Sequence, residues 1–225
     1  EGIRINIRGK KGEGLNGAAY KPSAVTMHFK GQLNNGAKII TLSKNAINRG
    51  FNLSCNSYAS CIDMSKLQIG NNVMANYYVW DPNQGTKGGY ACYPFSSKII
   101  LPAFSAFFVQ VMDTSSGNTI QFSENSKQPG ADPAQIFGQS NHPTNQLELA
   151  LYSDSIFYDK QVIIFKTSAS DSIDRFDAIK MMNPECNLYS TSSEKEKLTI
   201  DTRKAGRALV IPLGLVSTMD RSFTL

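Results

Sequence analysis

The stretch "NYYVWDPNQGTKGGYACYPF", residues 76–95, contains the pattern that decides the fold. Successive side chains of a β-strand point to opposite faces, so Tyr77 and Val79 should face one way while Tyr78 and Trp80 face the other. Turn-forming Asp-Pro and Gly-Gly pairs follow within a few residues. A strand that ends in a turn is therefore predicted, with one of its two faces buried in a core.

The same alternation of apolar and polar residues continues along the chain, and turn-forming residues separate the apolar runs. Only "IDMSKLQ" (62–68) and "DRFDAIKMM" (174–182) predict a helical turn, and both are too short for a self-supporting helix. The sequence thus predicts an all-β fold, an antiparallel β-sandwich or jelly roll with at most one or two short helical turns. The predicted strands are "RINIR", "AVTMHFK", "AKIITL", "GFNLSC", "NYYVW", "FSAFFVQV", "NTIQFS", "QLELALY", "KQVIIFK", "KLTI", "RALVIPL" and "SFTL".

Residues 124–146 contain three prolines and almost no aliphatic side chains. Such a segment is either a long surface loop or a boundary between two halves of a sandwich. We favour a single β-sandwich unit over residues 1–225, with a division near 124–146 as the alternative.

Composition excludes some classes of protein. The chain has 225 residues, 41% of them hydrophobic and 18% charged, and its apolar runs are all shorter than the roughly 18 residues that a transmembrane helix needs. Residues 1–50 contain nine Lys or Arg against two Glu, so the formal charge of +5 is concentrated there. Without a block of like charges, a solvated sheet face is the simplest interpretation, and neither a nucleic-acid partner nor a transmembrane segment is expected.

Motifs for catalysis are weak. "GEGLNG" (12–17) has the GxGxxG spacing, but Pro22 would end the helix that a dinucleotide site requires at this loop, so no cofactor is expected. The two histidines, His28 and His142, lie in unrelated contexts, and neither a GxSxG nor an HExxH motif is present. These observations favour a protein that is not an enzyme.

Two groups of residues are candidates for binding. Asp171, Asp174 and Asp177 recur at every third position and could hold calcium, although the spacing differs from that of an EF-hand and a solvated turn is favoured. Aromatic rings could instead stack on a sugar ring while neighbouring polar groups bind its hydroxyls, unless the rings simply fill the core. This platform would consist of Tyr78, Trp80, Tyr90 and Tyr93, with Asn76, Asp81 and Asn83 beside them.

The four cysteines form no CxxC pair and no zinc-ribbon spacing. Cys55 and Cys61 could close a small disulfide loop in an extracellular protein, and free buried thiols are the alternative. Four cysteines in a chain of this length are too few for a disulfide scaffold, so the core must supply the stability.

Residues 50–64, "GFNLSCNSYASCIDM", resemble the segment Gly-Trp/Phe-Asn-Leu-hydrophobic-Gly-Asn-Pro-Tyr/Phe-Pro-Ser-x-Ile-Asp-Trp of large secreted and surface proteins of the Bacteroidetes, where it commonly precedes a type IX secretion sorting domain. Further similar segments follow in the same order, so the resemblance covers roughly residues 50–225. Both prolines of the family segment are missing, and Cys55 replaces a glycine. A Cys55–Cys61 bridge is one candidate for a constraint that replaces the rigidity of the missing prolines. The similar segments are "YYVWDPNQGTKGGYACY", "IILPAFSAFFVQVMDTSSGNTIQFSENSKQ", "LELALYSD", "DKQVIIFKTSASDSIDRFDAIKM", "NLYS", "KLTID" and "VIPLGL".

The resemblance implies an extracellular or cell-surface all-β module of a longer multidomain protein, and the family supplies no catalytic residues to carry over. We therefore expect a non-catalytic module with an adhesive or presenting role, whose partners are an unknown glycan or surface protein and the neighbouring domains of its own chain. A carbohydrate-binding module with an aromatic platform is the alternative, and an accessory domain of a secreted hydrolase is the third interpretation.

Overall fold

The computed structural model describes residues 9–10, 23–26, 28, 30–44, 47–131, 145–170, 172–206 and 208–225. Within these ranges the chain is nearly all β, which confirms the predicted fold class. Its strands are β1 (Lys38–Thr41), β2 (Phe51–Cys55), β3 (Ile62–Asp63), β4 (Gln68–Ile69), β5 (Val73–Asp81), β6 (Gly89–Pro94), β7 (Ile100–Leu101), β8 (Ala106–Val111), β9 (Thr119–Phe122), β10 (Gln146–Ser153), β11 (Ile156–Lys166), β12 (Ala178–Ile179), β13 (Cys186–Thr191), β14 (Lys197–Lys204) and β15 (Leu213–Ser217).

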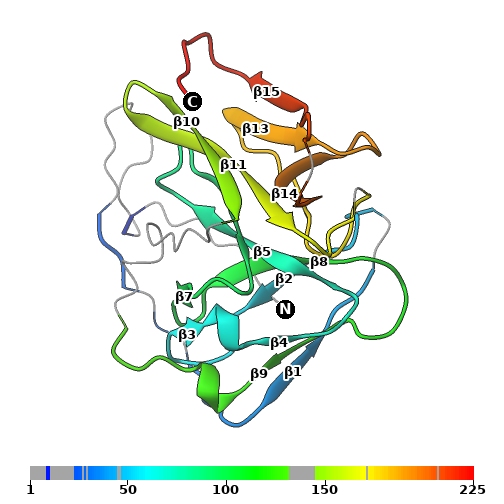
Figure 1. Ribbon diagram of the computed structural model, residues 1–225. Coiled ribbons are helices and arrows are strands. Elements are labelled where there is room, and N and C mark those ends of the chain that lie inside the picture. The colour runs from blue at the N-terminus through cyan, green and yellow to red at the C-terminus, as the bar shows by residue number, and fades with distance from the viewer. Residues whose placement is uncertain are drawn as a thin grey trace.

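The sheets form three layers (Figure 1). The middle layer is a four-stranded sheet in the order β2-β8-β5-β6. On one side lie the three-stranded sheet β1-β9-β4 and the short pair β3-β7, and on the other lies a six-stranded sheet in the order β10-β11-β14-β13-β15, with β12 paired to β14. Strands before residue 131 thus build two layers, and strands after residue 145 build the third.

The middle sheet is buried on both faces, because β5 sends alternate side chains into two different cores. Tyr77 and Val79 pack in a cluster with Phe107 of β8 and Phe122 of β9. Tyr78 packs on the opposite face in a second cluster that includes residues of β11, β12 and β14. The sequence predicted a core on one of these faces, and the structure buries large rings on both.

The six-stranded sheet has a further apolar layer on its outer face. Leu151, Tyr158 and Leu188 are buried there, and Phe223 near the C-terminal end packs edge-on against Tyr158 with 6.0 Å between ring centroids. Within this sheet β11 and β14 pair in parallel, while β10 with β11, β12 with β14, β13 with β14 and β13 with β15 pair antiparallel. A crossover therefore carries the chain from the end of β11 back to the start of β14.

Several local predictions fail. The described part of "AVTMHFK" is not a strand, and "DRFDAIKMM" contains β12 instead of a helical turn. The strand predicted at "RALVIPL" begins only at Leu213, and "SFTL" forms a single bridge between Thr224 and Tyr152. "IDMSKLQ" does contain a helical turn, the 3-10 helix Met64–Lys66, which Asp63 caps. "RINIR" lies outside the described residues.

Candidate functional site

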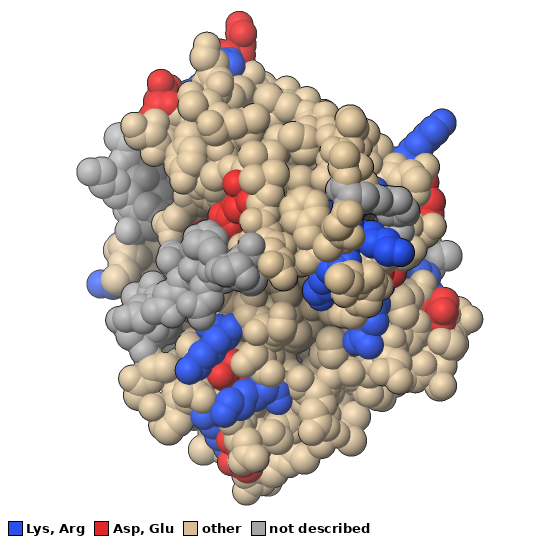
Figure 2. Space-filling model, in the orientation of Figure 1, with Lys and Arg blue, Asp and Glu red and all other residues tan. Residues whose placement is uncertain are grey.

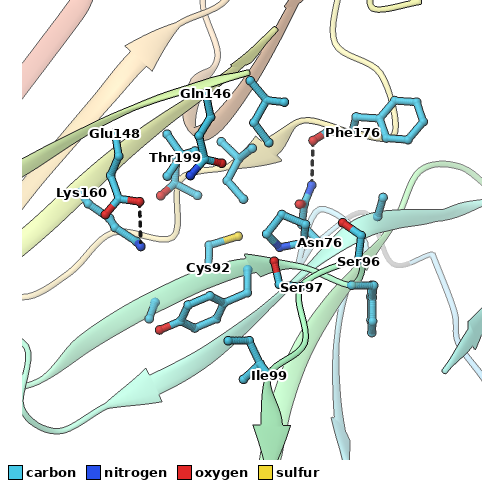
Figure 3. A pocket seen from close by; sticks show the side chains of 18 of the residues that line it. Asn76, Cys92, Ser96, Ser97, Ile99, Gln146, Glu148, Lys160, Phe176 and Thr199 are labelled. Atoms are coloured by element: carbon cyan, nitrogen blue, oxygen red, sulfur yellow. Dashed lines mark hydrogen bonds and ion pairs between the residues drawn. The ribbon is translucent and has the colours of Figure 1, made fainter. Parts of the chain in front are cut away.

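A cleft of about 930 Å³ lies where the six-stranded sheet meets the edge of the middle sheet (Figure 3). The edge strand β6 and the loop after it form one wall, and β10 with β11 forms the other. Strand β10 is itself the edge of its sheet, so two sheet edges border the same hollow. We refer to this hollow as the β6–β10 cleft.

Side chains at alternate positions of β10 line the cleft. Gln146, Glu148, Ala150 and Tyr152 face it, while Leu151 is buried in the outer core of the same sheet. Facing positions of β11 complete this wall, because the register pairs each lining residue of β10 with a lining residue of β11. These partners are Ile164, Val162, Lys160 and Phe157.

An ion pair lies within the cleft. Lys160 Nζ lies 3.3 Å from Glu148 Oε2, and each side chain is 23% exposed. The same ammonium lies 5.7 Å from the ring centroid of Tyr93, which belongs to the opposite wall. Burial and the negative charges of Asp81 and Glu148 raise the pKa of Tyr93 to about 12, so its hydroxyl stays neutral and available as a hydrogen-bond donor.

The inner end of the cleft is lined by Asn76 and Cys92. The Asn76 amide donates to the carbonyl oxygens of Phe176, at 2.9 Å, and Asp177, at 3.1 Å, which ties the middle sheet to the loop before β12. Burial raises the pKa of the Cys92 thiol well above its usual range. This thiol is therefore a neutral part of the lining and a poor nucleophile.

The structure divides the predicted aromatic platform between different environments. Trp80 and Tyr90 are cross-strand partners with ring centroids 5.0 Å apart, but their planes meet at 79°, so the two rings do not form one flat surface. Tyr78 is buried, and its hydroxyl donates to the carbonyl of Ile179 at 2.7 Å. Tyr93 lies on the other face of β6, where it packs near Tyr77.

Four of the predicted binding residues, Asn76, Asp81, Tyr90 and Tyr93, line the β6–β10 cleft. Asp81 is 8% exposed, and burial raises its pKa although the backbone amide of Asn83 donates to it at 2.8 Å. Asn83 is exposed on the turn between β5 and β6.

The predicted calcium ligands act as caps for backbone amides. Asp177 Oδ1 accepts from the amide of Thr202 at 2.7 Å, and its Oδ2 accepts from the amide of Asp174 at 2.8 Å. Asp174 in turn accepts from the amide of Phe176. Asp171 lies outside the described residues, and within those residues no group of three or more His, Cys, Asp or Glu could hold a metal ion.

All four cysteines fall in the described part of the chain and are free thiols, so the hypothetical bridge between Cys55 and Cys61 is absent. An asparagine fixes this corner instead. Asn56 is 1% exposed, and its amide donates to the carbonyls of Ser60 at 2.7 Å and Pro102 at 2.8 Å while its oxygen accepts from the amide of Tyr58.

His28 is exposed, and His142 and the glycine-rich segment 12–17 lie outside the described residues. Gln146, Glu148 and Lys160 were not predicted as site residues. Their strands were predicted, but the polar face of a single strand is expected to face solvent. Only the register between β10 and β11, and the way their sheet overhangs β6, reveal that these side chains face a cleft.

The fold and the cleft define an all-β protein of three sheet layers with a concave site between two sheet edges. The chain belongs to the family described as "Domain of unknown function (DUF8693)", whose model matches residues 7–225. Neither the search of curated proteins nor the search of solved structures found a match. In the part of the chain that the structure describes, every helix is too short or too polar to cross a lipid bilayer.

Proposed function

We propose that this chain is a non-catalytic, extracellular module of a cell-surface or secreted protein, where it mediates adhesion or presents neighbouring domains. The ordered motifs of residues 50–225 support this proposal, because they resemble surface and secreted proteins of the Bacteroidetes. The chain is then one module of a longer polypeptide.

The observation that carries the non-catalytic part is the role of the buried carboxylates. Among the described residues, each buried carboxylate has a hydrogen bond or an ion pair within the fold, and only two of the six, Asp81 and Asp159, line the β6–β10 cleft. A general acid or base must lie within hydrogen-bond reach of its substrate, so the other four are not placed for catalysis in this cleft. The six are Asp63, Asp81, Asp159, Asp177, Glu185 and Asp201.

Two of these carboxylates fasten the layers to each other, which suits a module that must transmit force. Glu185 binds the turn between β5 and β6 by accepting from the backbone amides of Thr86, at 2.7 Å, and Lys87, at 3.2 Å. Burial opposes ionisation of Glu185, but hydrogen bonds from the Thr86 hydroxyl and from these two amides outweigh it and lower its pKa. Asp159 accepts both from Lys180 and from the side chain of Gln84 in the same turn.

Carbohydrate binding is the second candidate function, and the β6–β10 cleft favours it because the cleft combines aromatic rings with amide, hydroxyl and carboxylate groups. Adhesion to a glycan and presentation of neighbouring domains are compatible roles for one module. An accessory role beside a secreted hydrolase is the third interpretation, and it would use the same cleft to hold a polymeric substrate.

Protease shaving of intact cells tests the extracellular placement. Peptides from this chain should appear in the supernatant before lysis, at levels like those of known surface proteins of the same cells. Recovery of these peptides only after lysis, with surface proteins released normally, would contradict the proposal.

Incubation of the purified chain with panels of polysaccharide, peptide and ester substrates tests the absence of catalysis. We expect product to form no faster than in buffer. Turnover that disappears in Asp81→Asn or Glu148→Gln, with folding unchanged by circular dichroism, would refute the non-catalytic assignment.

A further inference from the structure

The inner face of β10 is unusual for a strand whose sheet packs against another layer on that side. Its neighbour β11 contributes Val162 to the core between the sheets, where the middle sheet covers it. Gln146 and Glu148 lie beside that core on the same face, where a covered sheet would hold apolar side chains. Polar residues at these positions are expected if a ligand enters the cleft that they line.

The polar groups of the cleft are held in place by the fold. Glu148 on β10 and Lys160 on the neighbouring strand β11 are diagonal neighbours whose charged groups lie 3.3 Å apart, and both are only partly exposed. Asn76 is 1% exposed and fixed by two hydrogen bonds. Side chains that rigid strands position in this way lose little entropy when a ligand binds, so they favour specific recognition.

The charges of the cleft indicate the class of ligand. The lining contains three lysines, Lys98, Lys160 and Lys166, against three carboxylates, Asp81, Glu148 and Asp159, so it carries no net formal charge. Glu148 pairs with Lys160, and Lys166 lies over the ring of Phe176 at 4.0 Å. In Figure 2 most of the visible face is uncharged, and the basic side chains gather in two groups that have acidic side chains beside them. A phosphorylated or nucleic-acid ligand would need concentrated positive charge.

The shape and lining of the cleft add to this argument. Its volume lies near the upper end of the roughly 300–1,000 Å³ range of small-molecule sites, which allows for more than one sugar ring. Tyr93 offers a ring and a neutral hydroxyl, Ser97 and Gln146 offer donors and acceptors, and the Glu148 carboxylate accepts. A hydroxyl-rich, uncharged ligand uses this mixture, whereas an acyl chain would leave the polar groups unpaired.

We propose that the β6–β10 cleft binds a short neutral oligosaccharide, with Glu148 and Gln146 bonded to sugar hydroxyls and Tyr93 packed against a ring face. This inference rests on the proposed adhesive function and gives it a ligand class and a site. It places recognition on the inner face of β10, away from the Trp80 side chain that the sequence suggested.

The test is an array of neutral and acidic glycans probed with the purified chain, followed by calorimetry with a neutral oligosaccharide that the array identifies. Glu148→Gln and Gln146→Ala should each raise the dissociation constant about tenfold, because each removes a hydrogen bond made in a partly buried site. Leu147→Ser is the matched control, since Leu147 is an exposed neighbour on the opposite side of the same strand and its loss should leave affinity unchanged.

Three results would overturn the inference: silence across the array, binding restricted to acidic glycans, or full binding by both cleft variants with loss of binding in Trp80→Ala. Circular dichroism and urea unfolding of each variant separate lost binding from lost folding. Adhesion of chain-coated beads to cells distinguishes this inference from the broader proposal, because adhesion that persists with a silent array refutes the glycan site alone.

Discussion

Replacing Lys180 by methionine tests the buried ion pair that anchors the third layer. Lys180 Nζ lies 2.6 Å from both carboxylate oxygens of Asp159, and the two side chains are 1% and 2% exposed. Asp159 also accepts from the backbone amide of Leu188 at 2.7 Å. Two further amide donors, from Gln84 and Asn183, lie at 3.4 Å.

Removing the lysine leaves a buried carboxylate with amide partners but without a cation. Such a change costs about 3–5 kcal/mol of the free energy of unfolding. A domain of ordinary stability has about 5–15 kcal/mol in total, so Lys180→Met should remove a large share of it. Burial raises the pKa of Asp159, and the positive charge of Lys180 lowers it without cancelling the rise. Without the cation this pKa rises further. The variant should therefore lose less stability at acidic pH, where Asp159 can take up a proton, than at pH 8.

Urea unfolding, monitored by far-UV circular dichroism, measures this cost. Wild type and variant should unfold with the same m-value, so the difference in midpoint gives the difference in stability. The double variant Asp159→Leu with Lys180→Met removes both charges and should recover most of the stability lost by Lys180→Met, leaving a deficit of about 1–2 kcal/mol from the unpaired Leu188 amide. A cost below about 1 kcal/mol for Lys180→Met would refute the reasoning, as would a double variant whose cost equals the sum of the two single costs.

Three other changes give further checks. Asn56→Ala should cost about 2–3 kcal/mol in urea unfolding because it leaves buried carbonyls and an amide unpaired, whereas Cys61→Ser should change stability by less than about 1 kcal/mol; the reverse order would mean that the thiols fix the corner. Burial raises the pKa of Asp177 to about 6, above its value of about 3.8 in an unfolded chain. The folded state therefore holds this proton more tightly, so the stability from Asp177 is complete below about pH 4 and is lost as pH rises through 6. The wild type should lose up to about 2–3 kcal/mol over this window relative to Asp177→Asn, and parallel pH profiles would contradict that sign. Gly88→Ala should destabilise the fold and shift the Trp80 emission spectrum, because Gly88 has φ +80° and an added Cβ would lie 2.6 Å from the indole; an unchanged spectrum and midpoint would show that the turn adapts freely.

The fold class followed from the sequence because alternation is a local property. Strands such as β5, β8 and β11 lie where the apolar runs predicted them, since each run is long enough to specify a face. The segment "RALVIPL" failed because the strand begins only after its proline, at Leu213. Proline cannot donate a ladder hydrogen bond, which is the physical reason for the shift.

The candidate site was only partly predictable. Tyr90, Tyr93 and Asp81 were found because aromatic rings beside turn residues stand out in a sequence. Glu148 and Lys160 were missed because they are 12 residues apart, and the antiparallel register of β10 and β11 brings them together. The corner at Asn56 shows the same limit, because its partner Pro102 comes from a segment 46 residues away.

Burial of the middle sheet on both faces bears on how the chain can be divided and inherited. A fragment ending near residue 131 would expose Tyr78, Phe108 and Cys92, which now pack against the third layer. A fragment starting near residue 145 would expose Val162 and its neighbours in the same way. The two portions of the chain must therefore be acquired, lost and exchanged as one piece, so gene rearrangements that preserve function should break outside the segment between residues 124 and 146.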